Sequence, residues 1–368
     1  MRILVVVGTR PEAIKMLPLV RELKKHSRFE VFVCYSGQHK DMCRGIFEYF
    51  GIEPDIKFSV MKSGQSLCEL SLRLQKSFGE LFDAEKFDIV LVHGDTTTAF
   101  CATLAAFYRG VRVAHAEAGL RTYRREPFPE EFNRVAIDRM SIMHLPPTEE
   151  AVKNLEAEGI FGTQAVGNTV IDALSYTIDE NYRSPILDRA RGRKIILVTA
   201  HRRENLGEKM KSALLGIGDV LKSREDMFAI FPMHPNPRIR SIAMEVFENI
   251  PNIELCEPLF VRDFHNILAR SFATVTDSGG IQEEAAYLGI PVFLMRDATE
   301  RAEALACGNI RLVGTDRNTV FETFCRTIED KKALSSMQQK SYVFGNGHTC
   351  EKIVKKLLSM EENNDIIS

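Results

Sequence analysis

The sequence predicts an α/β protein built from two doubly wound, Rossmann-like domains. Its 368 residues are more than one ordinary hydrophobic core organises. Short runs rich in β-branched residues alternate with segments of helical periodicity, an order typical of parallel strands joined by crossover helices. A softer, polar stretch at residues 175–193 interrupts this order, which then starts again. Because such sheets bind ligands at the carboxyl ends of their strands, we expect a cleft between the two domains.

The periodicity assigns strands and helices in each half. In the first half, strands are expected at 3–8, 31–35, 89–93 and 111–117, with helices near 12–25, 40–50, 66–82, 98–109 and 130–140. In the second half, strands are expected at 194–199, 228–233, 273–276 and 291–294, with helices near 210–222, 238–247, 263–271, 281–288 and 318–330. Thr9 as a cap and Pro11 in the first turn mark the start of the first helix. We place the two domains at residues 1–172 and 173–349.

Composition excludes several classes of protein. The net charge of −2 provides no overall positive field for nucleic acid. No run of about 18 apolar residues predicts a membrane span, and the apolar stretch at the N-terminus is too short for a signal peptide. The eight cysteines form no CxxC pair and lack histidines at metal-binding spacing, so neither a disulfide scaffold nor a metal site is expected. Reduced thiols in a cytoplasmic protein are the simplest interpretation.

Two strand-to-helix turns are candidates for binding phosphate. GTRPE (8–12) follows the first strand and DSGG (277–280) follows the strand at 273–276. A helix N-terminus offers free N–H groups to an anion. The first turn is not GxGxxG, since arginine and proline stand where a dinucleotide turn needs small residues, and this counts against NAD. Glu284 could accept hydrogen bonds from a ribose or only favour the helix dipole; Arg10 could equally be a surface arginine.

Acidic residues stand at three consecutive strand-to-helix junctions. Asp95 lies in HGDTTT (93–98), Glu117 ends an expected buried strand, and Glu130 and Glu131 begin a helix. An aspartate before a helix is most often an N-cap. Three junctions in succession are harder to explain by capping, so we expect the carboxylates to converge and to divide acid and base roles.

Two histidines follow strands of the second half. His201 stands between Ala200 and two arginines, whereas His234 follows the next strand. A lone histidine is more often structural than catalytic. The arginines beside His201 favour contact with a phosphate or donation of a proton.

Taken together, these motifs resemble one enzyme family along nearly the whole chain. The matching stretches are 8–16 (GTRPEAIKM), 38–42 (QHKDM), 93–98 (HGDTTT), 117–122 (EAGLRT), 129–134 (PEEFNR), 167–172 (GNTVID), 200–204 (AHRRE), 277–285 (DSGGIQEEA) and 295–301. In this order they are similar to the non-hydrolysing UDP-N-acetylglucosamine (UDP-GlcNAc) 2-epimerases.

The resemblance implies a GT-B-like architecture and a specific reaction. It implies that a C-terminal helix near 350–362 rejoins the first domain and that the protein is a homodimer. The implied reaction converts UDP-GlcNAc reversibly to UDP-ManNAc by eliminating and re-adding UDP through a glycal, without metal or nicotinamide. A hydrolysing epimerase that releases ManNAc and UDP, and a GT-B glycosyltransferase, are alternatives. A non-enzymatic nucleotide-sugar binder is less favoured, because clustered carboxylates would repel its ligand.

The resemblance also implies roles for individual residues. The implied catalytic residues are Asp95, Glu117, Glu130 and His201. The implied substrate-binding residues are Arg10, Lys15, Arg134, Phe264, Ser278, Gly279, Gly280 and Glu284, with Glu284 at the ribose and Phe264 against the uracil. Positions matching an activator site for a second UDP-GlcNAc are Gln38, Gln65, Arg202 and His234.

Overall fold

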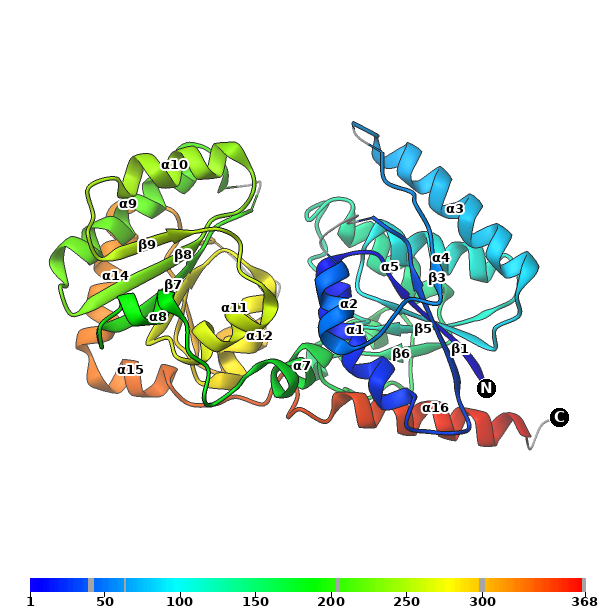
Figure 1. The fold of residues 1–368 in the computed structure, drawn as a ribbon. Helices are drawn as coiled ribbons and strands as arrows, with labels where there is room; N and C mark the ends of the chain where they lie inside the picture. The colour runs from blue at the N-terminus through cyan, green and yellow to red at the C-terminus, as the bar shows by residue number, and fades with distance from the viewer. Residues whose placement is uncertain (39–42, 63, 203–204, 298–301, 366–368) are drawn as a thin grey trace. The chain divides into compact units, whose positions relative to one another are not determined.

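The chain folds into two compact units, each built on a six-stranded parallel sheet (Figure 1). A computed structural model describes residues 1–38, 43–62, 64–202, 205–297 and 302–365. Unit 1 comprises Met1–Ala173 and the chain from Phe344 onward, and unit 2 comprises Leu174–Val343. The matched stretches 38–42, 200–204 and 295–301 lie partly outside the described residues.

The sheet of unit 1 has the strand order of a Rossmann fold. Its strands are β1 (Arg2–Val7), β2 (Glu30–Tyr35), β3 (Ile56–Lys57), β4 (Ile89–His93), β5 (Arg112–Ala116) and β6 (Met143–Leu145). They pair in parallel in the order β3-β2-β1-β4-β5-β6. The order reverses between β1 and β4, which is where ligands of such sheets bind.

The sheet of unit 2 repeats this topology. Its strands are β7 (Lys194–Thr199), β8 (Met227–Pro232), β9 (Ile253–Cys256), β10 (Ala273–Thr276), β11 (Val292–Leu294) and β12 (Ile310–Leu312). The order β12-β11-β10-β7-β8-β9 is again all parallel and reverses between β7 and β10. Each unit therefore has one such switch point.

Helices cover both sheets. Those of unit 1 are α1 (Arg10–Leu23), α2 (Arg44–Phe50), α3 (Leu67–Ala84), α4 (Thr97–Phe107), α5 (Glu130–Met140), α6 (Glu149–Ala157) and α16 (Thr349–Asp365), and α7 (Thr169–Thr177) leads into unit 2. Those of unit 2 are α8 (Pro185–Arg189), α9 (Glu208–Ser223), α10 (Pro237–Phe247), α11 (Val261–Ala269), α12 (Gly279–Leu288), α13 (Ala302–Ala306), α14 (Arg317–Glu329) and α15 (Lys331–Met337). No helix among the described residues is long and apolar enough to cross a membrane.

The last helix of the chain completes unit 1. α16 packs against α1 (Figure 1). At its start, the backbone N–H groups of Thr349 and Cys350 donate to the buried Asp172 carboxylate at 3.2 and 2.8 Å. A carboxylate at a helix N-terminus satisfies donors that have no partner within the helix.

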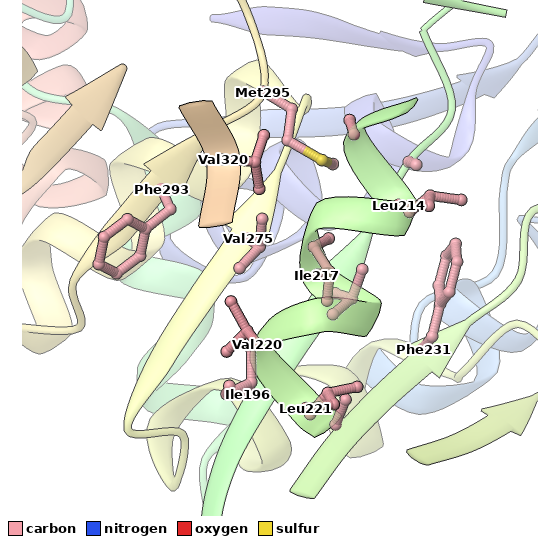
Figure 2. Close-up of a cluster of buried hydrophobic side chains, with 14 of the residues drawn as sticks. Ile196, Leu214, Ile217, Val220, Leu221, Phe231, Val275, Phe293, Met295 and Val320 are labelled. Carbon is pink, nitrogen blue, oxygen red and sulfur yellow. The ribbon is translucent and has the colours of Figure 1, made fainter. Parts of the chain in front are cut away.

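Each unit has its own hydrophobic core. In unit 2, Ile196 of β7 and Val275 of β10 lie under Leu214 and Ile217 of α9 (Figure 2). In unit 1, strands β1 and β4 pack against α3 and α4 around the fully buried Phe78. Strands of covered parallel sheets are apolar on both faces, which is why β1 and β4 read as continuous apolar runs in the sequence.

Candidate active site

In unit 1, the turn after β1 packs tightly on the start of α4. A Cβ atom at Gly8 would lie 2.3 Å from Thr98 Oγ1 and 2.9 Å from Ser36 Oγ, so only glycine fits. The buried Glu12 carboxylate accepts from the N–H groups of Gly8 and Thr9 at 3.0 and 2.6 Å. Its other oxygen accepts from the Thr96 hydroxyl at 2.7 Å. Burial raises the pKa of Glu12 to about 7 despite these hydrogen bonds. Glu12 therefore ties together the two loops at the switch point.

Glu117 occupies a strained position immediately after β5. Its backbone has φ of +66°, a left-handed conformation that non-glycine residues rarely adopt. Its Oε1 atom accepts from Lys15 Nζ at 2.6 Å and from Asn168 Nδ2 at 2.7 Å. Its Oε2 atom lies 3.9 Å from Nδ1 of His93, and burial lowers the pKa of His93 to about 3. The carboxylate thus lies between a lysine and a neutral imidazole.

Asp95 is fixed by Arg134, which lies one turn into α5. Arg134 Nε donates to Asp95 Oδ2 at 3.0 Å, and its Nη2 contacts the same oxygen. The side chain of Asn133 also donates to the backbone carbonyl of Asp95 at 2.8 Å. Burial alone would lower the pKa of Arg134, but Asp95 and Glu131 outweigh it and raise that pKa. The guanidinium therefore stays charged between two acids.

The two adjacent glutamates of α5 have different surroundings. Glu131 is buried; its Oε1 atom accepts from the N–H groups of Thr122 and Tyr123 at 2.9 and 3.0 Å, and its Oε2 lies 3.3 Å from Arg134 Nη1. The Glu130 side chain is half-buried and has no hydrogen bond or ion pair with the described part of the chain. Glu131 therefore holds the loop at Thr122 and Tyr123, whereas Glu130 is available to contact a ligand.

In unit 2, Asp277 organises the loop after β7. The fully buried carboxylate accepts from the N–H of His201 at 3.1 Å and of Arg202 at 3.0 Å, and from Asn205 Nδ2 at 3.3 Å. The Nδ1 atom of His201 lies 3.3 Å from Asp277. Burial lowers the pKa of His201, and Asp277 opposes this only in part. The ring stacks on His234 at a centroid distance of 6.2 Å. His201 is therefore a neutral, oriented imidazole beside the switch point.

The helix α12 begins at the same switch point. Its capping residue, Ser278, makes no side-chain bond to the helix, so the hydroxyl is not used for capping. A Cβ atom at Gly280 would meet nothing within 4 Å, which leaves room for a ligand close to the backbone. Free N–H groups at such a helix start suit an anion; Gly279, also in this first turn, is buried.

Glu284, on the same helix, has an unsatisfied oxygen. Among the described residues its buried Oε2 atom has no hydrogen-bond partner. Its Oε1 atom lies 3.5 Å from Nε2 of His265, whose Nδ1 contacts Thr177 Oγ1 at 2.6 Å. Phe264 is half-buried and stands beside His265. A buried carboxylate oxygen without a donor is costly unless a ligand supplies one.

The residues predicted to bind an activator have partners of their own. Gln38 Oε1 accepts from the N–H and hydroxyl of Thr98 at 3.2 and 2.7 Å. Gln65 Oε1 accepts from the N–H of Lys62 at 3.0 Å and contacts Arg73. Within unit 1 these two glutamines therefore have separate anchors. In unit 2, His234 is exposed and accepts from the N–H of Asn236 at 3.1 Å.

Three further residues belong to these sites but were not singled out from the sequence. Asn168 binds Glu117, Glu12 joins the two loops of unit 1, and Asp277 fixes His201. All three lie inside the matched stretches, and Glu12 and Asp277 also lie in the two predicted phosphate-binding turns, but the contacts to Glu117, Thr96 and His201 join parts of the chain that are distant in sequence. No group of three or more histidine, cysteine or acidic side chains that could hold a metal occurs among the described residues.

The fold and the polar groups at both switch points define a class of protein. Two Rossmann-like units of this topology place the chain among the GT-B-like, two-domain α/β proteins. The sequence profile described as UDP-N-acetylglucosamine 2-epimerase matches residues 21–358. The chain belongs to the UDP-N-acetylglucosamine 2-epimerase family.

Individual relatives agree over nearly their whole length. The UDP-N-acetylglucosamine 2-epimerase of Bacillus subtilis is 43% identical over 364 residues, which cover 97% of this chain and 95% of that protein. The structure of UDP-GlcNAc 2-epimerase from Neisseria meningitidis bound to UDP-GlcNAc has a TM-score of 0.92 at 39% identity, covering 98% of this chain and 100% of that one. The Methanocaldococcus jannaschii UDP-GlcNAc 2-epimerase in complex with UDP-GlcNAc and UDP has a TM-score of 0.84 at 30% identity, with coverage of 98% and 100%.

Proposed function

We propose that this protein is a non-hydrolysing UDP-GlcNAc 2-epimerase that interconverts UDP-GlcNAc and UDP-ManNAc. The observation that carries the proposal is Glu117, a nearly buried carboxylate held in a strained conformation between Lys15 and His93. Strain of this kind persists where the surroundings enforce it and collects at active sites. The names and bound ligands of the relatives, UDP-GlcNAc and UDP, identify the substrate class.

Unit 2 binds the UDP moiety in this proposal. The start of α12 at Ser278, Gly279 and Gly280 donates N–H groups to the diphosphate, and His201 adds a further donor. The unsatisfied oxygen of Glu284 accepts from a ribose hydroxyl. Phe264 lies against the uracil.

Unit 1 carries the acid and base groups. The C2–H bond of the sugar is not next to a carbonyl, so a carboxylate cannot remove this proton directly. When the C1–O bond breaks, the electron pair leaves with UDP and C1 becomes oxocarbenium-like. A carboxylate then takes the C2 proton and the C1=C2 glycal forms. Protonation of C2 on the other face and attack of UDP on C1 give the epimer, and all atoms are recovered.

The proton transfers are assigned to three carboxylates. Glu117, Asp95 and Glu130 are the proposed acid and base groups. Lys15 and Arg134 hold the carboxylates of Glu117 and Asp95 in place through ion pairs. Glu130, which has no partner among the described residues, is available to exchange a proton with the substrate.

We further propose a homodimer and a second UDP-GlcNAc that acts as activator at Gln38, Gln65, Arg202 and His234. Gln38 supports this role, because its carbonyl oxygen contacts the first turn of α4 next to the loop of Asp95. A ligand that binds Gln38 would therefore alter the position of the first turn of α4 and of the neighbouring loop that carries Asp95.

Incubation of the pure protein with UDP-GlcNAc in D2O, followed by proton NMR, tests the function. We expect UDP-ManNAc to appear with deuterium at C2 of both sugars, and Glu117→Gln to abolish this exchange. Free ManNAc with stoichiometric UDP would indicate the hydrolysing epimerase instead. No turnover without an added acceptor would favour the glycosyltransferase, and retention of the original hydrogen at C2 during epimerisation would exclude the glycal route.

A further inference from the structure

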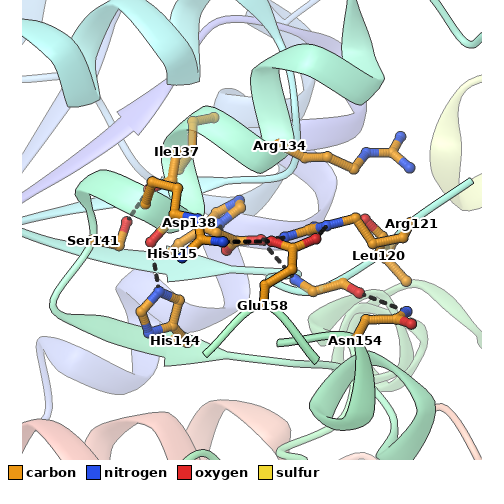
Figure 3. A network of polar contacts seen from close by, with 12 residues as sticks. His115, Leu120, Arg121, Arg134, Ile137, Asp138, Ser141, His144, Asn154 and Glu158 are labelled. Atoms are coloured by element: carbon orange, nitrogen blue, oxygen red, sulfur yellow. Dashed lines mark hydrogen bonds and ion pairs between the residues drawn. The ribbon is translucent and has the colours of Figure 1, made fainter. Parts of the chain in front are cut away.

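A largely buried group of charges is hydrogen-bonded to the segment that carries Glu117. Asp138 of α5 is contacted by His115 of β5 and by Arg121 of the following loop, and Arg121 pairs in turn with Glu158 (Figure 3). We call these four residues the Asp138 cluster. The side chains of His115, Asp138 and Arg121 are 0% exposed, so none of them reaches a ligand. Burying charges is costly unless every one is paired, so this cluster requires an explanation beyond stability.

The cluster is bonded to the backbone on both sides of Glu117. Asp138 Oδ2 accepts from the N–H of Gly119 at 3.1 Å, two residues after Glu117. His115 Nε2 lies 2.7 Å from the carbonyl oxygen of Gly94, the residue before Asp95. Gly94 in turn donates its N–H to Ala116 at 2.9 Å. The segment that carries Glu117 and the loop that carries Asp95 are thus joined through one carboxylate.

The hydrogen bonds hold both ring nitrogens of His115. Its Nδ1 lies 2.6 Å from Asp138 Oδ1 and its Nε2 lies 2.7 Å from the carbonyl oxygen of Gly94. Burial alone would raise the pKa of Asp138, but His115 and Arg121 outweigh it and lower that pKa. Asp138 is therefore an anion held by His115 and Arg121.

Such a cluster explains how Glu117 keeps its strained backbone. A non-glycine residue at φ of +66° is strained and persists only where its neighbours enforce it. The N–H of Glu117 is itself bound to Leu145 at 3.1 Å, and the Gly119 bond fixes the chain on the other side. Without the hydrogen bond from Gly119 to Asp138, we expect the backbone between Glu117 and Gly119 to rotate. The Glu117 carboxylate then loses its contacts with Lys15 and Asn168.

We propose that Asp138, acting through His115 and Gly119, is a positioning residue that holds Glu117 in its reactive orientation relative to Asp95. The inference rests on the proposed function of Glu117. Asp138 touches no reacting atom, so its loss affects the chemical step rather than the binding of the nucleotide.

The test compares Asp138→Asn with a variant that is destabilised elsewhere. The asparagine side chain keeps the shape of the aspartate but has no negative charge, and it has only one acceptor oxygen for the contacts with His115, Arg121 and the N–H of Gly119. We expect kcat to fall roughly tenfold or more, while KM and the affinity for UDP stay within about threefold. The matched control is Phe78→Leu, a change in the core of unit 1 where Phe78 packs against Phe58 and Phe82. It lowers the melting temperature and leaves kcat unchanged.

A second measurement needs no substrate. Hydrogen exchange of the peptide spanning residues 112–122 is followed by mass spectrometry in both variants. Asp138→Asn should raise exchange in this peptide, and Phe78→Leu should not. An unchanged kcat in Asp138→Asn, an equal loss of kcat in Phe78→Leu, or unaltered exchange at 112–122 would overturn the proposal. If exchange rises but the wild type does not epimerise UDP-GlcNAc, the proposed function fails and the anchoring role stands.

Discussion

At the scale of single residues, three acids of the candidate site, Glu117, Asp95 and Asp277, each have their own cation or donors. Lys15 pairs with Glu117, Arg134 with Asp95, and Asp277 binds the loop of His201. Asp95 and Glu117 could be proposed as candidates because they follow expected strands directly, whereas Asp277 was noted only as part of the turn at 277–280. Their pairing could not be predicted, since Lys15 and Glu117 are 102 residues apart and only the folded chain brings them together.

Breaking the Lys15–Glu117 pair should destabilise unit 1. The two side chains are 11% and 10% exposed, so Lys15→Met leaves a nearly buried carboxylate without its counter-ion. We expect a loss of about 3 kcal/mol in the free energy of unfolding. Urea titration followed by circular dichroism measures it. The double variant Lys15→Met/Glu117→Gln should recover most of the loss, and a single variant as stable as the wild type would contradict the buried ion pair.

Binding of the nucleotide sugar should strengthen as the pH falls. Burial holds the pKa of His201 below its usual value, so the free protein has a neutral imidazole at pH 7. A bound diphosphate favours the charged form, so binding takes up a proton and affinity rises severalfold towards low pH. Calorimetry with UDP-GlcNAc between pH 8 and pH 6, in a Glu117→Gln background that prevents turnover, measures this. His201→Gln should remove the pH dependence; an identical slope in that variant would assign the proton to another group.

At the scale of elements, the long central strands and their helices were the predictable part. The expected strands at 89–93, 194–199 and 273–276 coincide with β4, β7 and β10, because buried parallel strands are continuous apolar runs. The edge strands β3, β6, β9 and β12 were not predicted. They have two to four residues and are only partly buried, so they lack the length and the pattern that distinguish a strand from a loop.

The junction between β1 and α1 should not tolerate any side chain at Gly8. The new Cβ of Gly8→Ala would lie 2.6 Å from Thr98 Cβ, so either the turn at residues 8–12 or the start of α4 must move. We expect a loss of about 2–3 kcal/mol in stability and a large loss of turnover. The control is Gly51→Ala, at φ of +62° with nothing within 4 Å, which should cost about 1 kcal/mol and leave turnover unchanged. Equal effects of both substitutions would contradict the close packing at Gly8.

At the scale of the whole molecule, the chain builds two similar units and returns to the first. The restart of the strand pattern after residue 193 indicated two domains, and the predicted boundary lies between residues 172 and 173; in the structure the chain changes unit after Ala173, within α7. The helix α7 continues across this boundary, and its backbone hydrogen bonds are those of any α-helix, so the pattern of its residues does not mark the point where the unit changes.

Removing the chain after residue 345 should unfold unit 1 selectively. The truncation deletes α16, exposes the face of α1 that it covers, and leaves the buried Asp172 carboxylate without its two N–H donors. We expect peptides of β1 and α1 to lose protection in hydrogen exchange, while peptides of β7 and α9 keep theirs. The control truncation ends after Asp365 and retains α16. Equal loss in both units would show that their stabilities are not separate.

The return of α16 to unit 1 also orders events during synthesis. A ribosome makes every residue of unit 2 before it makes Thr349. Unit 2 can therefore finish folding while the chain is still attached to the ribosome. The sheet of unit 1 is synthesised first but cannot pack against α16 until the end of the chain has been made. Unit 1, which carries Glu117, is consequently the last part of the molecule to be completed, and a chain that stalls before Thr349 has a complete unit 2 and an incomplete unit 1.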